Sequence, residues 1–427
     1  MSYTVQHFQQ LRNEYPTWES LSSHLEKDCG IRVVQTEESG KVILRTKKSE
    51  SSDDFLRSVV WDTLQNRPLC VAPFAGKKTP LPLNVEFPSI EECVDGVMIN
   101  AFVEASGGSL KLATRTQIGA KNKFYSEKSF ETMFQEALVG TSLIGMGGLE
   151  KVLRDWIASV EGATSCFVSF VLQHPEHRIV AKPTSAKLFC VHVGYCKEDG
   201  EVQMYETPVH WPEVLATTFA VTRYGEAEGV PSVFASEDAV KETLKKLSLK
   251  KGWRWQGLMV KDGAGARWAL RSSTYVQMRK LRGGEATNLE RFLRLRKDGL
   301  LRDYLKHYSE DKDVFWELEQ KLRARTENIM EAYTDVHKLH KCKFKEIPEV
   351  YRPVVFRLHA KYMEQKKDQG EGQGKRSVSF KDVVQVVSEL ADFERKRLVL
   401  AAPYVSPPAS VEIPEAKEAK EAKDAVQ

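Results

Sequence analysis

The chain has 427 residues, of which 41% are hydrophobic and 29% charged, and its net charge is +4 at pH 7. This composition is typical of a globular protein with a sizeable core, and the length predicts two or three domains. The sequence has no apolar run long enough to span a bilayer and no signal peptide pattern at its N-terminus. We therefore expect an intracellular protein, cytoplasmic or nuclear, that is not secreted and has no membrane partner. The small net charge does not by itself indicate a nucleic-acid partner.

The seven cysteines are an odd number at wide spacings, and no C-x-x-C occurs. This usage favours free thiols in a reducing compartment over a disulfide framework.

The first 75 residues predict helices followed by short strands. Residues 5–28 have apolar positions at helical spacing, and Pro16 marks a break between two helices. Residues 31–34 and 42–45 predict a hairpin, and 59–61 and 69–72 predict a second pair of strands.

Residues 89–125 carry the most informative pattern. Asp95-Gly96 precedes an apolar run, 97–103, a Gly-rich turn follows, and a second run, 110–114, ends at Arg115-Thr116. The pattern predicts an antiparallel hairpin with polar residues at its ends. Such ends can hold the sugar and phosphates of a nucleotide, or they can be the solvated rim of an ordinary hairpin.

Residues 126–282 predict further strands with a few helices. Two helices are expected over 126–161 and one over 236–251, with strands elsewhere, including a strand, turn and strand over 166–180 with the turn at 174–177. We expect an α+β domain over 1–284. Helical periodicity then predicts an all-helical domain over 285–400, including a long helical pattern over 286–340. The repetitive residues 401–427 predict a disordered, low-complexity tail.

Five short motifs occur in the order seen in one enzyme family. They are Cys93-Val94-Asp95-Gly96, Thr114-Arg115-Thr116, Phe170-Val171, Gln256-Gly257-Leu258-Met259-Val260 and Ala269-Leu270-Arg271. With the predicted strands around them, the chain resembles the phage-type ATP-dependent RNA ligases of the covalent nucleotidyltransferase superfamily. The resemblance implies nucleotidyltransferase-like antiparallel sheets with flanking helices, followed by the helical domain.

The chain departs from this family at the positions that carry the chemistry. Such enzymes attack ATP with a lysine, and the matching position here is Cys93. Val171 stands where the family has a metal-binding carboxylate. The Glu and the two lysines of the last two motifs are replaced by Gln256, Ala269 and Arg271. The resemblance therefore implies that adenylyl transfer is lost or strongly altered, that no residue is a confident catalytic group, and that ATP and Mg²⁺ are cofactors only if activity remains.

The binding half of the family pattern is better preserved. The resemblance and the basic strand ends suggest a set of nucleotide-binding residues: Arg57, Asp95, Gly96, Arg115, Phe170, Gln256, Gly257 and Arg271. Phe170 either stacks on a base or belongs to the core. A basic stretch predicts RNA contacts, unless it is only the solvated face of a helix. Its residues are Arg279, Lys280, Arg282, Arg291 and Arg294. RNA is the expected partner, and a nucleotide is a further one.

Other groups of residues in the sequence give weaker indications of function. His174, His177, Cys190 and His192 do not fit a zinc spacing, so no metal site is expected. Two alternatives to a non-catalytic RNA-ligase-like protein stay open. One is an active ligase that uses a relocated lysine, such as Lys77, Lys78 or Lys111. The other is a structural or assembly protein that reuses the scaffold.

Overall fold

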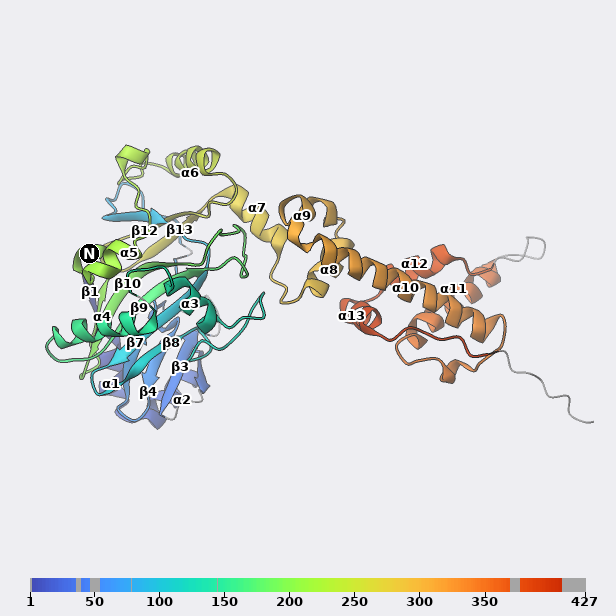
Figure 1. Ribbon diagram of the computed structural model, residues 1–427, viewed down its shortest axis with the longest axis horizontal. Helices are drawn as coiled ribbons and strands as arrows, with labels where there is room; N and C mark the ends of the chain where they lie inside the picture. The colour runs from blue at the N-terminus through green and yellow to red at the C-terminus, as the bar shows by residue number, and fades with distance from the viewer. Residues whose placement is uncertain are drawn as a thin grey trace, which may run out of the picture. The chain divides into compact units, whose positions relative to one another are not determined.

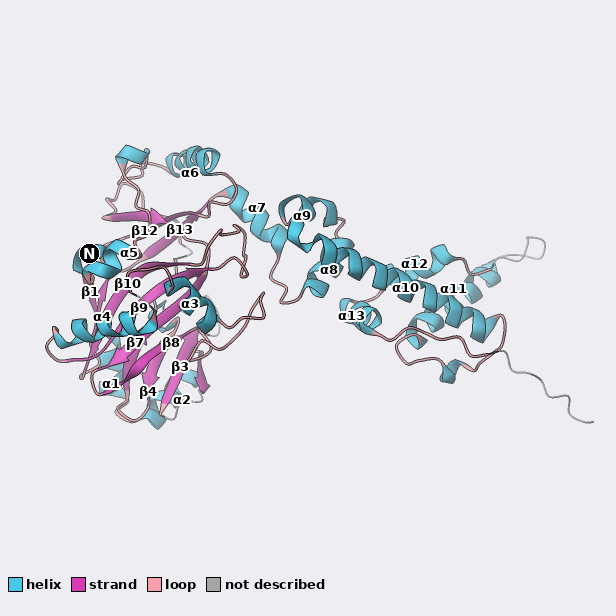
Figure 2. Ribbon diagram, in the orientation of Figure 1, coloured by secondary structure: helices cyan, strands magenta, loops and turns pink. Residues whose placement is uncertain are grey.

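The computed structural model describes residues 2–35, 40–46, 54–77, 79–143, 145–368 and 377–408. The chain divides into two units, Met1–Arg282 and Gly283–Gln427. The first is a mixed unit of antiparallel sheets and helices and the second is helical (Figures 1 and 2). The domain boundary predicted after residue 284 lies two residues from this division.

The described residues of the first unit include three antiparallel sheets. The largest has the strand order β1-β11-β10-β9-β7-β8, and the two others have the orders β2-β3-β4-β5 and β13-β12-β6. The strands of the largest sheet are β1 (Ser2–Val5), β7 (Val97–Glu104), β8 (Gly107–Ala113), β9 (Ala163–Gln173), β10 (Lys187–Lys197) and β11 (Val202–Tyr205). Those of the second are β2 (Ile31–Gln35), β3 (Lys41–Thr46), β4 (Val59–Asp62) and β5 (Arg67–Val71). Those of the third are β6 (Ser89–Glu92), β12 (Gly257–Lys261) and β13 (Arg267–Arg271).

The two faces of the largest sheet belong to different cores. Phe170 on β9 joins the core shared with α3 (Phe130–Leu138), α4 (Met146–Ala158) and α5 (Glu213–Thr218). Phe167 joins the core shared with the four-stranded sheet and with α1 (His7–Glu14) and α2 (Trp18–Lys27). Alternate faces of one strand therefore bury side chains on both sides, which explains why β9 is apolar along most of its length.

The helix α6 (Glu237–Lys251) shows how local sequence sets an element. Its N-cap is Ser236, whose side chain accepts from the backbone N–H of Ala239, and acidic residues occupy its first turn. Two lysines lie in its last turn, and Gly252 follows with a φ of +79°. The cap, the charges and the C-terminal glycine all stabilise the ends of this helix. The predicted helix over residues 236–251 matches α6 closely.

The sequence predictions differ from the structure at several elements. The strand expected after the turn at 174–177 is a loop that continues to residue 186. The strands β1 and β6 and the helices α5 and α7 (Ser273–Arg282) were not predicted. The helical pattern over 286–340 is three helices, α8 (Asn288–Lys297), α9 (Leu301–His307) and α10 (Lys312–His337). Gly299, with a φ of +71°, lies between the first two and explains that break.

The helical unit is built around α10. It packs against α8 and against α11 (Arg352–Asp368), α12 (Phe380–Glu389) and α13 (Asp392–Leu400). None of the helices in the described part of the chain is long and apolar enough to cross a membrane.

The segment after α13 also belongs to this packed unit. Tyr404 is 7% exposed and its hydroxyl lies 3.0 Å from Oδ2 of Asp335, while Tyr351 donates to the carbonyl of Ala402 at 2.8 Å. The tail was predicted to begin at residue 401, but Tyr404 is buried against the helices, and the carbonyls of Ala401 and Ala402 bind Arg325 and Tyr351. Most of the predicted tail, the Gly-rich stretch 370–375 and Lys78 lie outside the described residues.

Candidate functional site

Four of the predicted site positions meet where β6 ends and β12 begins. The backbone N–H of Cys93 donates to the carbonyl of Gly257 at 2.9 Å. Gly257 is paired with Arg271 in the register of β12 and β13, and Gln256 precedes it. Residues some 160 positions apart in the chain therefore share one strand end.

Asp95 lies two residues further on and links three segments. Its Oδ2 accepts from the backbone N–H of Val180 at 3.0 Å and of Ala181 at 3.3 Å. Its Oδ1 accepts from the hydroxyl of Tyr275 at 2.7 Å. Burial and then the charge of Asp95 raise the pKa of Tyr275, so this hydroxyl stays protonated and donates. Both carboxylate oxygens thus bind protein groups.

The two glycines of the motifs are required by close backbone contacts. A Cβ at Gly96 would lie 2.5 Å from the carbonyl oxygen of Leu172. A Cβ at Gly257 would lie 2.0 Å from the carbonyl oxygen of Leu270, and Gly257 has a φ of +143°. Any larger residue would push the strands apart, so packing alone accounts for both glycines.

Cys93 occupies the position of the family's nucleophile but is poorly suited to that role. Its side chain is 7% exposed. Burial raises the pKa of its thiol to about 11, although Arg271 and Arg267 act in the opposite direction. Since the thiolate is the reactive form, Cys93 is a weak nucleophile near neutral pH.

The position of the family's metal carboxylate lies in an apolar cluster. Val171 packs with Val191 and Val221, and Val94, Met98 and Phe189 lie against them. These side chains offer no oxygen to a cation.

The histidines considered for zinc have separate partners. The Nε2 of His174 lies 2.7 Å from Oε2 of Glu136, and that of His192 lies 3.0 Å from the carbonyl of Val71. In the part of the chain that the structure describes, no three His, Cys, Asp or Glu residues are grouped so that they can hold a metal ion.

Gln256 and Arg271 are the predicted residues that retain binding capacity at this strand end. The Oε1 atom of Gln256 is buried and has no hydrogen-bond partner among the described residues. Arg271 is exposed. A buried amide oxygen without a donor is costly, and an incoming donor would satisfy it.

Two predicted nucleotide contacts lie elsewhere. Phe170 is fully buried, with its ring centroid 5.5 Å from that of Phe134 and 5.3 Å from that of Phe219, so it is a core residue and does not stack on a base. Arg57 lies two residues before the start of β4, in the four-stranded sheet. Arg115 is exposed in the turn after β8. Antiparallel pairing of β7 with β8 and β9 brings this turn to the same end of the sheet as Asp95.

Three of the five predicted RNA-binding residues serve the fold. Arg282 is 6% exposed, and its guanidinium carbon lies 4.5 Å from the ring centroid of Tyr125. Arg291 is 1% exposed and donates to Asn288 at 2.7 Å. Arg294 pairs with Glu285 at 2.5 Å. The sequence did not reveal that these cations have internal partners. Lys280 is exposed and Arg279 is partly exposed.

The lysines proposed as relocated nucleophiles lie in other surroundings. The amine of Lys111 pairs with Glu104 at 2.9 Å, and Lys41 shares that carboxylate at 3.3 Å. The amine of Lys77 lies 5.7 Å from the ring centroid of Trp268.

A buried charge cluster near the site was missed by sequence reasoning. The amine of Lys261 lies 2.6 Å from Oε1 of Glu91 and 2.9 Å from Oε2 of Glu206. Burial opposes ionisation of Glu206, but Lys261, Arg267 and His192 outweigh it and hold its pKa at about 2. The cluster joins the three-stranded sheet to β10, since Lys261 also donates to the carbonyl of Val191 at 3.3 Å. The only signal for this cluster in the sequence was the position of Lys261 at the end of an apolar strand, on the same face as Met259 two residues earlier.

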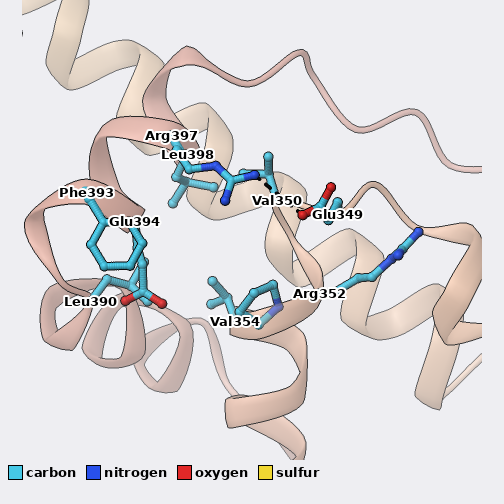
Figure 3. Close-up of a pocket in the computed structure, with 10 residues that line it drawn as sticks. Glu349, Val350, Arg352, Val354, Leu390, Phe393, Glu394, Arg397 and Leu398 are labelled. Atoms are coloured by element: carbon cyan, nitrogen blue, oxygen red, sulfur yellow. Dashed lines mark ion pairs between the residues drawn. The ribbon is translucent and has the colours of Figure 1, made fainter.

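A separate hollow of about 230 Å³ lies in the helical unit (Figure 3). Apolar side chains including Val354, Leu390 and Phe393 line it, and Arg397 pairs with Glu349 at 3.6 Å beside it. The carboxylates that line the hollow, Glu349 and Glu394, pair with Arg397 and Arg357, and none of the predicted site residues lies there, so it is a weaker candidate than the strand end around Cys93.

No family model matches the chain, and comparison with curated proteins gives no match. The likeness to RNA ligases therefore stays a prediction from the motifs.

Proposed function

We propose that this protein binds a nucleotide or RNA ends at the strand end formed by Cys93, Gln256, Gly257 and Arg271, without transferring adenylate. The observation that carries the proposal is the hydrogen bond from Cys93 to Gly257, which brings the first and fourth motifs together. A binding site assembled from distant motifs in this order fits a ligase-like protein better than chance proximity does.

The groups at the site support the proposed absence of adenylyl transfer. A phosphoramidate requires an amine, whereas Cys93 offers a buried thiol with a pKa of about 11. Stabilising charge on a transferring phosphoryl group requires cations or metal ions at the reacting atoms, and Val171 cannot hold a metal.

Binding is supported by the charge around the strand end. Arg271 is exposed, and it and Arg267 both lower the pKa of Cys93, so a positive potential acts there. Guanidinium groups bind phosphate through paired hydrogen bonds. Gln256 adds a polar side chain whose oxygen lacks a donor.

The test combines a chemical and a binding measurement. The full chain is incubated with α-labelled ATP and Mg²⁺ and then denatured, and we expect no label on the protein. Binding of a 5′-phosphorylated RNA oligonucleotide is followed by fluorescence anisotropy at several salt concentrations. We expect the affinity for RNA to fall as the salt concentration rises. At each salt concentration, the Arg271→Gln variant should bind more weakly than the wild type. Arg323→Gln, an exposed arginine on α10, is the control.

Each measurement can contradict one half of the proposal. Label retained on denatured protein would show that adenylyl transfer persists. Equal affinity of the Arg271→Gln variant and the wild type would remove the site from this strand end.

One observation favours a second candidate, a structural or assembly protein. The carboxylate of Asp95, expected to border a ribose, is already bound by Tyr275 and by two backbone N–H groups. A scaffold without a ligand predicts no rise in melting temperature with ATP or RNA, because only a ligand of the native state raises it.

A further inference from the structure

Three side chains at the end of α2 form a hydrogen-bonded series that the proposed function does not use. The Sγ atom of Cys29 lies 3.3 Å from Nε2 of His24, and Nδ1 of His24 lies 2.8 Å from Oδ2 of Asp28. A thiol, an imidazole and a carboxylate in this order are the arrangement that activates the nucleophile in many enzymes. The series includes no residue of the strand end around Cys93.

The end of the helix brings these three residues together. His24 and Asp28 are four positions apart on α2, so their side chains share one face of the helix. Asp28 is the C-cap, and Gly30 follows with a φ of +63°, where the chain turns towards β2. The N–H of Cys29 donates to the carbonyl of His24 at 3.3 Å, which fixes the thiol beside the last turn.

The imidazole of His24 is held in a defined orientation. The ring of Tyr15 stacks on it, with the centroids 4.3 Å and the planes 14° apart. The side-chain amide of Asn66 donates to the carbonyl of Tyr15 at 3.0 Å and holds that residue in turn. Because a carboxylate only accepts, the proton on Nδ1 is directed to Asp28, and Nε2 faces the thiol. The neutral ring therefore accepts the proton of Cys29 at Nε2.

The thiol of Cys29 is also accessible. Of the seven cysteines, all within the described residues, Cys29 and Cys342 are partly exposed and the others are buried. The side chain of His24 is 22% exposed. The Sγ atom of Cys342 lies 3.7 Å from the hydroxyl of Tyr404, and a phenol is not a base near neutral pH. Cys342 is therefore an internal comparison, a thiol of similar exposure beside a phenol instead of an imidazole.

We propose that Cys29 is a site of reversible modification, at which its thiol exchanges with small-molecule disulfides. Nε2 of His24 takes the proton of the thiol, and Asp28 stabilises the resulting imidazolium. The thiolate attacks one sulfur of the disulfide R–S–S–R, and the S–S bond breaks as the bond from Sγ forms. The other sulfur leaves with the electron pair of the broken bond and takes the proton from Nε2. Cys29 is thereby oxidised to a mixed disulfide, and one R–SH is released.

Disulfide exchange fits these residues better than acyl transfer does. Exchange requires an accessible thiolate and a group that accepts and returns its proton, which Cys29 and His24 supply. Acyl transfer also requires N–H donors aimed at an oxyanion. The N–H of Cys29 itself is already bonded to the carbonyl of His24. The modification does not depend on RNA binding by the strand end around Cys93.

The test uses the full reduced chain and oxidised glutathione at pH 6.5, where a thiol with the ordinary pKa of about 8.5 is only about 1% ionised. Mass spectrometry of peptides over time gives the rate of mixed-disulfide formation at each cysteine. We expect Cys29 to react about tenfold faster than Cys342, and its rate to rise less between pH 6.5 and pH 8.5.

Variants then identify the groups that activate the thiol. His24→Gln should slow the reaction of Cys29 about tenfold at pH 6.5 and leave that of Cys342 unchanged. Asp28→Asn retains the imidazole and should slow Cys29 by a smaller factor. His210→Gln, at an exposed histidine elsewhere in the first unit, is the matched control and should change neither rate.

The outcomes distinguish an activated thiol from one that is merely exposed. Equal rates at Cys29 and Cys342 in the wild type would overturn the proposal. A fast Cys29 whose rate is unchanged in the His24→Gln and Asp28→Asn variants would owe its rate to exposure alone, which also overturns it. The buried Cys196 reports folding and should stay unmodified in each variant. Should a variant unfold, the wild type still decides, because equal pH dependence at Cys29 and Cys342 contradicts activation by His24.

Discussion

The hydroxyl of Tyr275 donates to Oδ1 of Asp95 across 2.7 Å, and the two residues are 180 positions apart in the chain. Asp95 also accepts from the backbone of Val180 and Ala181. A single carboxylate therefore joins the start of β7, the loop after β9 and the first turn of α7. The residue expected to contact a ribose has a structural role that is visible without any ligand.

The first prediction concerns this bond. Tyr275→Phe keeps the ring but leaves Asp95 without its hydroxyl donor, and we expect the free energy of unfolding to fall by about 2 kcal/mol, because bonds to charged groups are the stronger ones. Urea unfolding of the full chain measures this change. Tyr15→Phe is the control, since the hydroxyl of Tyr15 has no hydrogen-bond partner in the described part of the chain. An equal loss in both variants would show that the bond to Asp95 contributes nothing.

The second prediction concerns the thiol of Cys93. With a pKa of about 11 and a side chain 7% exposed, only about one molecule in a thousand carries the thiolate at pH 8. Iodoacetamide should therefore alkylate Cys93 far more slowly in the native protein than Cys29 or Cys342, which are partly exposed. Mass spectrometry of peptides over time measures the rates, and urea should make them equal. Rapid native labelling of Cys93 would mean that the neighbouring arginines stabilise the thiolate, and the non-nucleophilic assignment would be wrong.

Sequence reasoning located elements with strong local signals. The helices α2 and α6 have a cap, an apolar period and charged ends, and hairpins such as β7–β8 have Gly-rich turns between apolar runs. β1 was missed because its four residues become a strand only by pairing with β11, which is some 200 positions away. The apolar residues around Val180 suggested a strand, but Asp95 holds that backbone as a loop. These long-range partners have no local signature.

The candidate site was predictable only in part, because some of its contacts depend on partners that are distant in the sequence. The motifs named Cys93, Gly257 and Arg271 as site positions, and in the structure a hydrogen bond and the strand register bring these residues together. Which core receives Phe170 depends on the register of β9, because both faces of this strand are buried and a shift of one residue exchanges them. The partners of Arg291 and Arg294 depend on tertiary packing, so the charge pattern alone could not show that these residues are occupied.

The third prediction concerns acid stability. Burial lowers the pKa of His192 and of His177 to about 4, below the ordinary value of 6.5. The unfolded chain then binds more protons than the folded one between these values. Stability is therefore complete above pH 6.5 and falls as the pH drops towards 4, by up to about 3 kcal/mol for each histidine. Glu206, with a pKa of about 2, contributes a further loss only below pH 4.5.

Unfolding in urea at pH 7.5, 6 and 5 measures this loss, and variants identify its source. His192→Gln retains a donor for the carbonyl of Val71 and should flatten the dependence of stability on pH. His210→Gln, at an exposed histidine, should leave the dependence unchanged. If the His192→Gln variant keeps the wild-type slope, His192 is not the group that titrates, and its burial does not govern acid stability.

The last prediction concerns the end of the helical unit. A chain that stops after Leu400 loses the bond from Tyr404 to Asp335 and the carbonyls of Ala401 and Ala402, which accept from Arg325 and Tyr351. Burial of the Tyr404 ring is lost as well, and Asp335, 3% exposed in the full chain, loses one of its donors. We expect the free energy of unfolding of the helical unit to fall by about 4 kcal/mol. A chain that stops after Pro408 retains all these contacts and is the matched control. Hydrogen exchange of the α10 amides measures the difference, and equal protection in the two truncated chains would show that residues 401–408 do not stabilise the helices.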